Sequence, residues 1–293
     1  MMGESQVRFV VGKGGVGKTT LTAALGLATA ATGRRVQLIE LEGRSELARS
    51  FDTDVALRPQ PTALFEHESG GTVVARHLAP DDALLEWMRD HGFGRLLPRL
   101  RASGAVDIIA TAVPGIRDVL ILGKIKAMSR EHPSDVILVD APATGHSLSL
   151  LASPASLVEA TRTGPIRRQA EEVADMLRDE RRCCVSLVTM PAELPVTEAI
   201  EAAYTLEDRA GVALSTVLVN QYVGSDPMLR EELSDIERAR QFTLARVDEE
   251  EHQRRRLSRD LPLPQMIVPH VEADTIGLEQ LFEIATALLE HVA

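Results

Sequence analysis

The segment that decides the fold reads Val7-Arg8-Phe9-Val10-Val11-Gly12-Lys13-Gly14-Gly15-Val16-Gly17-Lys18-Thr19. Residues 7–11 form a mainly apolar run that predicts a buried strand, and residues 19–32 predict a helix. The eight residues from Gly12 to Thr19 fit the phosphate-binding pattern G-x-x-x-x-G-K-[ST], which requires this strand–loop–helix setting. The backbone N–H groups of the loop and the helix N-terminus would face a triphosphate. Lys18 would reach its β- and γ-phosphates, and the Thr19 hydroxyl would bind Mg²⁺.

The loop carries a second lysine, Lys13, which an ordinary phosphate loop does not need. A lysine there resembles the deviant Walker A signature KGGxGK[ST], a class in which this lysine crosses a dimer interface to the partner's nucleotide. A cation supplied in trans to developing charge contributes roughly 10³–10⁵ in rate, or about 4–7 kcal/mol of barrier. The resemblance therefore implies a catalytic role for Lys13, and the alternative is a solvated loop lysine.

Composition narrows the class of protein. The chain has 293 residues, 44% of them hydrophobic, which suffices for a single α/β domain over residues 1–293. A net charge of -11 and an aromatic content of 3% argue against nucleic-acid binding. The start resembles no signal peptide and no segment is apolar enough to span a membrane, so we expect a cytoplasmic protein without direct membrane insertion. Cys183 and Cys184 are adjacent and form no C-x-x-C half-site, so no zinc is expected.

Apolar strand-like runs alternate with helical periodicity along the rest of the chain. This alternation predicts an α/β fold with a doubly wound, mainly parallel sheet, and a helical subregion at about residues 80–130 and 148–180. The remaining expected strands span 36–41, 136–140, 183–189, 215–220 and 265–268. Residues 52–80 are the least ordered-looking stretch, with a possible short strand at 72–75.

Candidate functional residues follow several expected strands, where the ligands of α/β sheets bind. Asp140 could hold Mg²⁺ directly or through water, although an N-cap aspartate is the alternative. Glu42 could orient or deprotonate the attacking water, although a solvated loop glutamate is nearly as plausible. Asn220, followed by Gln221, carries an amide that suits an adenine edge. His146, after a Thr-Gly pair, is either a switch residue or a capping and packing histidine.

These motifs together resemble the anion-transporting ATPase family, which includes the arsenite-pump ATPases and the ATPases that target tail-anchored membrane proteins. Gly12–Thr19 matches the family's GKGGVGKT in full, and Asp140–Leu148 is similar to its second-switch motif DTAPTGHTL. Weaker matches are Pro114-Gly115-Ile116 to PGI, Val219-Asn220-Gln221 to the adenine-reading VNQ, and Val268-Pro269 and Gly277-Leu278-Glu279 to C-terminal elements. The resemblance runs nearly end to end.

The resemblance implies that the protein binds ATP or ADP with Mg²⁺, hydrolyses ATP, and dimerises around the nucleotide. Catalytic roles fall to Lys13, Lys18, Glu42 and Asp140, metal binding to Thr19 and Asp140, and a switch role to Gly145 and His146. The residues expected to contact nucleotide are Gly12, Gly14, Gly15, Val16, Gly17, Lys18, Thr19, Thr20, Asn220, Gln221, Pro269 and His270. The partner would be a second copy or a paralogue, and the phosphate state would be coupled to an unknown protein client.

The chain also departs from the family pattern. The first switch of the family reads STDPAHSLSDAF, and here Glu42-Gly43 replaces its Asp-Pro. The added methylene can displace a water-positioning carboxylate by more than the ~0.5 Å that such sites tolerate, so hydrolysis could be slow. The zinc-clasp and arsenite-binding cysteines of the two branches are missing. An alternative reading is therefore a nucleotide-gated scaffold, or the inactive half of a heteromeric ATPase. A partitioning ATPase that acts on DNA or membrane is disfavoured by the acidic charge.

Overall fold

The phosphate-binding segment begins in a central strand of an eight-stranded sheet. The computed structural model describes residues 6–43, 45–89, 92, 95, 115–224 and 237–292. Its strands run in the order β3-β4-β2-β5-β1-β6-β7-β8, and all neighbours are parallel except β3 and β4. This order confirms the predicted α/β class with a mainly parallel sheet. The strands are β1 (Val7–Gly12), β2 (Arg35–Glu40), β3 (Thr62–Glu66), β4 (Thr72–His77), β5 (Val136–Ala143), β6 (Cys183–Thr189), β7 (Leu214–Tyr222) and β8 (Gln265–Pro269).

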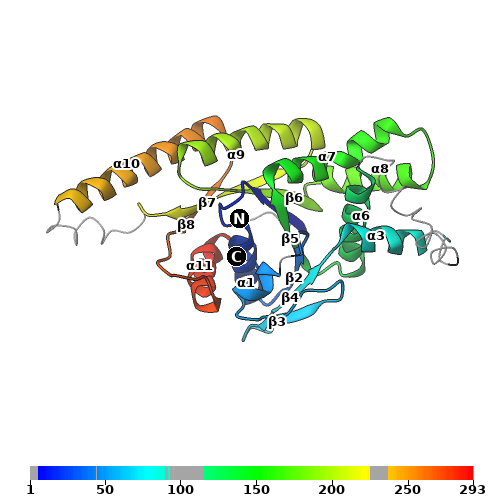
Figure 1. Cartoon of the computed structure of the whole chain (residues 1–293), viewed down its shortest axis with the longest axis horizontal. Coiled ribbons are helices and arrows are strands. Elements are labelled where there is room, and N and C mark those ends of the chain that lie inside the picture. Colours follow the sequence, from blue (N-terminus) through cyan, green and yellow to red (C-terminus); the bar gives the residue numbers. More distant parts are fainter. Residues whose placement is uncertain are drawn as a thin grey trace.

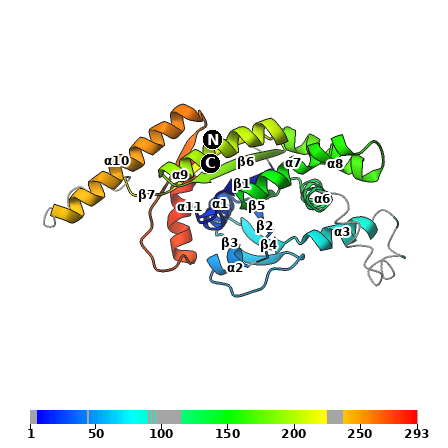
Figure 2. The same cartoon turned by 45° about the horizontal axis from the view of Figure 1, so that its top comes forward.

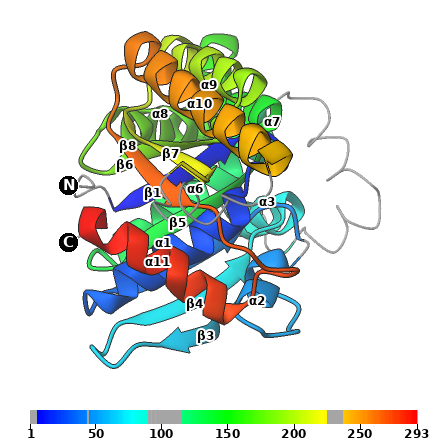
Figure 3. The same ribbon diagram turned by 90° about the vertical axis from the view of Figure 1, so that its left-hand side faces the viewer.

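Helices cover both faces of this sheet (Figure 1, Figure 3). One face carries α1 (Lys18–Ala31), α2 (Glu46–Ser50) and α11 (Leu278–Val292). The other face carries α3 (Pro80–Met88), α6 (Ile116–Glu131), α7 (Thr144–Ala160), α8 (Pro165–Arg178), α9 (Glu193–Thr205), the π-helical turn η2 (Leu206–Ala210) and α10 (Glu237–Asp260). Alternation along β1 divides the core between these faces, because Val7 and Phe9 pack on the α3–α10 side and Val10 packs on the α1 side.

The helices α3, α6, α7 and α8 pack on one another and form one end of the molecule (Figure 1, Figure 2). They belong to the predicted helical subregion. Part of that subregion lies outside the described residues, as does Pro114 of the expected PGI element. The extent of the domain over residues 1–293 stays a prediction.

Two segments differ from the sequence-based expectation. Residues 52–80 contain two strands, since β3 pairs antiparallel with β4 at the sheet edge. The helical stretch expected from residue 148 to about 182 is two helices, and the first, α7, already begins at Thr144. The long helix expected from Pro227 is described from Glu237 onward, as α10. None of the helices in the described ranges has the length and apolarity needed to cross a membrane.

Candidate nucleotide site

The loop between β1 and α1 has the backbone that its glycines predict. Gly15 and Gly17 have φ values of 85° and 91°, a left-handed region that strains other residues, and Gly17 is the N-cap of α1. A Cβ added at Gly12 would lie 2.4 Å from the backbone oxygen of Val188, so the start of the loop is clamped against β6. Cβ atoms at Gly14 and Gly15 would meet nothing within 4 Å, so the middle of the loop is open.

Thr19 and Asp140 meet directly behind this loop. The Thr19 Oγ1 donates a hydrogen bond of 2.7 Å to Oδ2 of Asp140, although the residues lie on α1 and β5. The other carboxylate oxygen of Asp140, Oδ1, is buried and has no hydrogen-bond partner among the described residues. Burial raises the pKa of Asp140 to about 6, against the opposing effects of the Thr19 hydrogen bond and the Lys18 charge. A hydroxyl beside a carboxylate with one unused oxygen fits Mg²⁺, which prefers oxygen ligands.

A cavity of about 430 Å³ lies in front of this pair. Residues 14, 15 and 17–20 of the loop and helix form one wall, and Glu40, Glu42, Glu46 and Asp140 line the cavity as well. Lys18 is the cation on this lining, and burial lowers its pKa. Among the described residues, four carboxylates and one ammonium line the cavity, and this excess of negative charge favours a nucleotide that brings its own cation. The cavity therefore suits a magnesium–nucleotide complex.

Glu40 is a site residue that the sequence analysis missed. It ends β2 in register with Asp140 on β5, and its side chain is 3% exposed. Its carboxylate accepts the backbone N–H of Ser45 at 2.9 Å and that of Leu47 at 3.5 Å, at the start of α2. Glu42 lies two residues beyond the end of the strand and lines the cavity. The sequence does carry a signal for Glu40, because it follows the mainly apolar residues 36–39 as Asp140 follows residues 136–139.

The two loop lysines both bond to acceptors of their own chain. The Lys18 ammonium donates to the backbone oxygen of Lys13 at 3.0 Å. The Lys13 ammonium forms an ion pair with Oε1 of Glu198, on α9, at 2.6 Å. The sequence did not predict the ion pair, because Lys13 and Glu198 are 185 positions apart.

Comparison with known proteins agrees with the loop geometry. The family described as anion-transporting ATPase matches residues 5–163, which is more than half of the chain. This chain belongs to the anion-transporting ATPase family. ATPase BagA of Mycobacterium tuberculosis is 35% identical to it over 225 residues, which cover 74% of this chain and 65% of BagA. ATPase get3 of Schizosaccharomyces japonicus is 28% identical over 169 residues, 55% of this chain and 50% of that relative. The fold is thus that of the P-loop NTPases.

The chain spans 65% of the length of its mycobacterial relative, less than two thirds. The proteins that it resembles are named as ATPases, and that name supports nucleotide binding and ATPase chemistry for the family.

The residues expected to contact adenine lie together at the ends of β7 and β8. Tyr222 pairs with Pro269, and the backbone N–H of His270 donates to the backbone oxygen of Tyr222 at 3.2 Å. The exposed Gln221 has a φ of 58°, which marks a sharp turn of the backbone. Asn220 is buried, and its Nδ2 donates to the backbone oxygen of Val16 at 2.8 Å. The amide of Asn220 thus braces the phosphate loop, and its role in reading adenine stays a prediction.

The expected second-switch residues lie in the first turn of α7. Gly145 and His146 are exposed there, one turn beyond the end of β5. His146 lies near Asp118 of α6. Burial raises the pKa of Asp118, and the charge of His146 opposes this rise. The exposure of His146 argues against the packing alternative. Its role as a switch residue stays a prediction.

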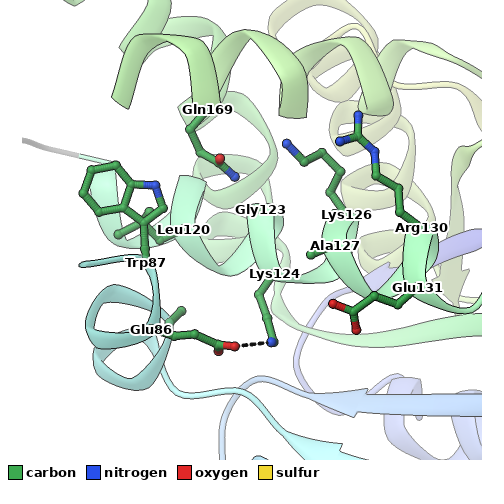
Figure 4. A pocket seen from close by; sticks show the side chains of 11 residues that line it. Glu86, Trp87, Leu120, Gly123, Lys124, Lys126, Ala127, Arg130, Glu131 and Gln169 are labelled. Atoms are coloured by element: carbon green, nitrogen blue, oxygen red, sulfur yellow. Dashed lines mark hydrogen bonds and ion pairs between the residues drawn. The ribbon is translucent and has the colours of Figure 1, made fainter. Parts of the chain in front are cut away.

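The helical subregion of this family member contains a second cavity, of about 400 Å³, between α3, α6 and α8 (Figure 4). Its lining mixes apolar residues such as Trp87 and Leu120 with charged ones: Lys124 pairs with Glu86 at 2.5 Å, and Arg130 and Glu131 lie farther along α6. The nearby leucines, such as Leu84 and Leu85, are buried in the core. In the described part of this subregion these leucines therefore belong to the core.

Proposed function

We propose that this chain is an ATPase that binds ATP with Mg²⁺ in the 430 Å³ cavity and hydrolyses it. The observation that carries the proposal is the Thr19–Asp140 pair, with its buried, unbonded Asp140 oxygen behind the phosphate loop. Family membership supports the same chemistry, because the related proteins are named as ATPases. The product would be ADP and phosphate.

Each residue of the cavity has a role in this proposal. The loop N–H groups and Lys18 bind the β- and γ-phosphates, while Thr19 and Asp140 hold the metal ion. Mg²⁺, when bound, would neutralise charge on the phosphate oxygens. Glu42 orients the attacking water, because it is the lining carboxylate that takes the place of the family aspartate. Glu40 positions the loop that carries Glu42, through its bonds to Ser45 and Leu47.

We infer further that two chains dimerise around nucleotide, with Lys13 supplying charge in trans. The partner is a second copy or a paralogue, since the sequence shows no internal repeat and one phosphate loop. In this proposal the segments 40–43, 45–47 and 140–147 would flank the γ-phosphate and respond to hydrolysis. They would pass this response to a protein client through α7, which begins directly after β5.

The direct test of ATPase activity compares Glu42→Gln with the unaltered chain. Phosphate release and nucleotide affinity are measured with ATP and Mg²⁺ on the same samples. We expect measurable turnover that falls at least tenfold in Glu42→Gln, while nucleotide affinity changes less than threefold, because general-base groups contribute roughly 10²–10⁴ in rate. Equal turnover in the two proteins would remove Glu42 from the mechanism.

A second candidate is a nucleotide-gated scaffold with negligible turnover. It is favoured by the glutamate at position 42, whose side chain is one methylene longer than the family aspartate. This candidate predicts nucleotide-dependent association without phosphate release, and Glu42→Asp would then raise turnover from background. If Glu42→Asp leaves phosphate release at background, the extra methylene is not what limits hydrolysis.

A further inference from the structure

The lysine that the proposed dimer needs in trans is bound within its own chain. Lys13 Nζ lies 2.6 Å from Oε1 of Glu198, and the two side chains are 40% and 31% exposed. Glu198 is on α9, which follows β6, the neighbour of β1 in the sheet. A carboxylate at this distance compensates the ammonium charge. A phosphate of a second copy must therefore compete with Glu198 for the same cation.

The main chain of Lys13 takes part in a second contact of the loop. Its backbone oxygen accepts the Lys18 ammonium at 3.0 Å. Lys18 is the residue that would bind the β- and γ-phosphates, so a phosphate group competes with this carbonyl for the ammonium. Both loop lysines thus bond to acceptors that phosphates would replace, and both bonds involve residue 13.

The glycines next to Lys13 limit which part of the loop can move when Lys18 releases the backbone oxygen of Lys13. Gly12 is clamped, since an added Cβ would lie 2.4 Å from the Val188 oxygen. Gly14 and Gly15 have open space around them. The peptide that follows Lys13 therefore lies at the boundary between a fixed and an open part of the loop. When the carbonyl loses Lys18, this peptide can turn and change the path of the Lys13 side chain.

We propose that Glu198 is a positioning residue that retains Lys13 within its own chain, and that phosphate binding at Lys18 releases it. This inference rests on the proposed function, because it assumes that Lys13 acts on the nucleotide of a second copy. In this inference, nucleotide binding and the release of Lys13 toward the second copy occur together. The retention of Lys13 therefore disfavours dimers that form without nucleotide.

The expected size of the effect follows from the exposure of the pair. Partly exposed ion pairs change an equilibrium by roughly 1.5- to fivefold. Dimerisation breaks one such pair in each copy, so the dimer dissociation constant changes by the square, about two- to twenty-fivefold. Glu198→Gln removes the charge and retains the shape of the side chain, so the helix is disturbed little.

The test measures the dimer dissociation constant of Glu198→Gln by sedimentation equilibrium with ADP and Mg²⁺. We expect it to be two- to twenty-fivefold lower than in the unaltered chain. Glu198→Gln in the Lys13→Ala background should give no dimer, because Lys13→Ala alone stays monomeric. Glu201→Gln, an exposed change on the same helix, is the matched control and should have no effect. An effect of Glu198→Gln that persists without Lys13, or a weaker dimer, would overturn the proposal.

A second measurement separates this inference from the proposed function. Amine acetylation of Lys13, followed by mass spectrometry, reports its pairing in the monomer. Glu198→Gln should increase the labelling rate of Lys13 at least twofold without nucleotide, and Glu201→Gln should not. An unchanged rate contradicts the pairing. If the unaltered chain never dimerises, the proposed dimer fails, and the labelling result alone decides whether Glu198 retains Lys13.

Discussion

Two carboxylates on adjacent strands of the site have different surroundings. Glu40 and Asp140 are in register on β2 and β5. Glu40 accepts two backbone N–H groups, whereas one oxygen of Asp140 has no hydrogen-bond partner among the described residues. A carboxylate that accepts backbone N–H groups stabilises the loop next to it, whereas a buried carboxylate oxygen without a partner is destabilising until a cation binds. These surroundings support Glu40 as a positioning group and Asp140 as the proposed metal ligand.

This difference predicts that Asp140→Asn stabilises the chain at high pH. The folded-state pKa of Asp140 is about 6, above its ordinary value of 3.8, so the free energy of unfolding falls as pH rises from about 4 to about 6. Asparagine cannot ionise, yet its oxygen still accepts the Thr19 hydroxyl. We expect a gain of about 1–3 kcal/mol at pH 8 and little change at pH 4.5, measured by urea unfolding without metal or nucleotide. A destabilised variant at pH 8 would contradict the assignment.

Glu40→Gln should act on stability and loop order. One of its two acceptor oxygens becomes an amide donor that faces a backbone N–H, so we expect a loss of about 1–2 kcal/mol in the free energy of unfolding. Amide hydrogen exchange should accelerate at Ser45 and Leu47, which donate to this carboxylate. Glu68→Gln, a change at an exposed turn position, is the control and should leave both quantities unchanged. Equal effects of the two variants would show that Glu40 has no special positioning role.

At the scale of elements, helices and loops are fixed by residues far away in the sequence. Asp52, just after α2, accepts the Leu278 N–H at 3.1 Å and so caps α11. A Cβ at Gly277 would lie 2.6 Å from Asp52 Oδ1, which explains the glycine before this helix. Asn220 on β7 likewise fixes the loop before α1. These contacts join the first-switch segment and the phosphate loop to the far edge of the sheet.

Asp52→Ala should destabilise the chain by about 1–2 kcal/mol. The change removes the cap of α11 and puts alanine at a φ of 52°, a left-handed conformation that asparagine tolerates better. Asp52→Asn keeps an acceptor oxygen and should lose less than half as much. Urea unfolding of both variants measures the difference. Equal losses would mean that the hydrogen bond and the backbone conformation contribute little.

Asn220→Ala should weaken the binding of all nucleotides to a similar degree. Its amide braces Val16, so its loss loosens the loop that every triphosphate uses. We expect affinities for ATP and GTP to fall together by roughly three- to tenfold, as for one lost hydrogen bond, measured by calorimetry. A selective loss for ATP would show instead that the side chain reads adenine.

The sequence predicts the elements of this fold where the pattern is local. The strand and loop of residues 7–19, and β5 from Val136 to Asp140, follow from apolar runs and glycine spacing, although β5 continues to Ala143. Thr62–Glu66 escaped prediction because it is a half-exposed edge strand without a clear alternation. Thr144 and Gly145 resemble a turn, yet α7 starts there. Contacts such as Lys13–Glu198 depend on tertiary packing, which no local pattern encodes.

At the scale of the whole molecule, the central claim is a dimer that shares its nucleotide sites. The chain carries a net charge of -11, which opposes self-association until specific contacts form. A lysine supplied across the interface would offset part of this repulsion beside the phosphates of the bound nucleotide. Dimerisation should therefore depend on both the nucleotide and Lys13.

The most direct measurement is the mass in solution by light scattering with ADP, Mg²⁺ and a transition-state mimic, for the unaltered chain and Lys13→Ala. We expect the mimic to double the mass of the unaltered chain, while Lys13→Ala stays monomeric although it still binds nucleotide. A mass that never responds to nucleotide, or a dimer that forms equally well without Lys13, would contradict the shared-site account.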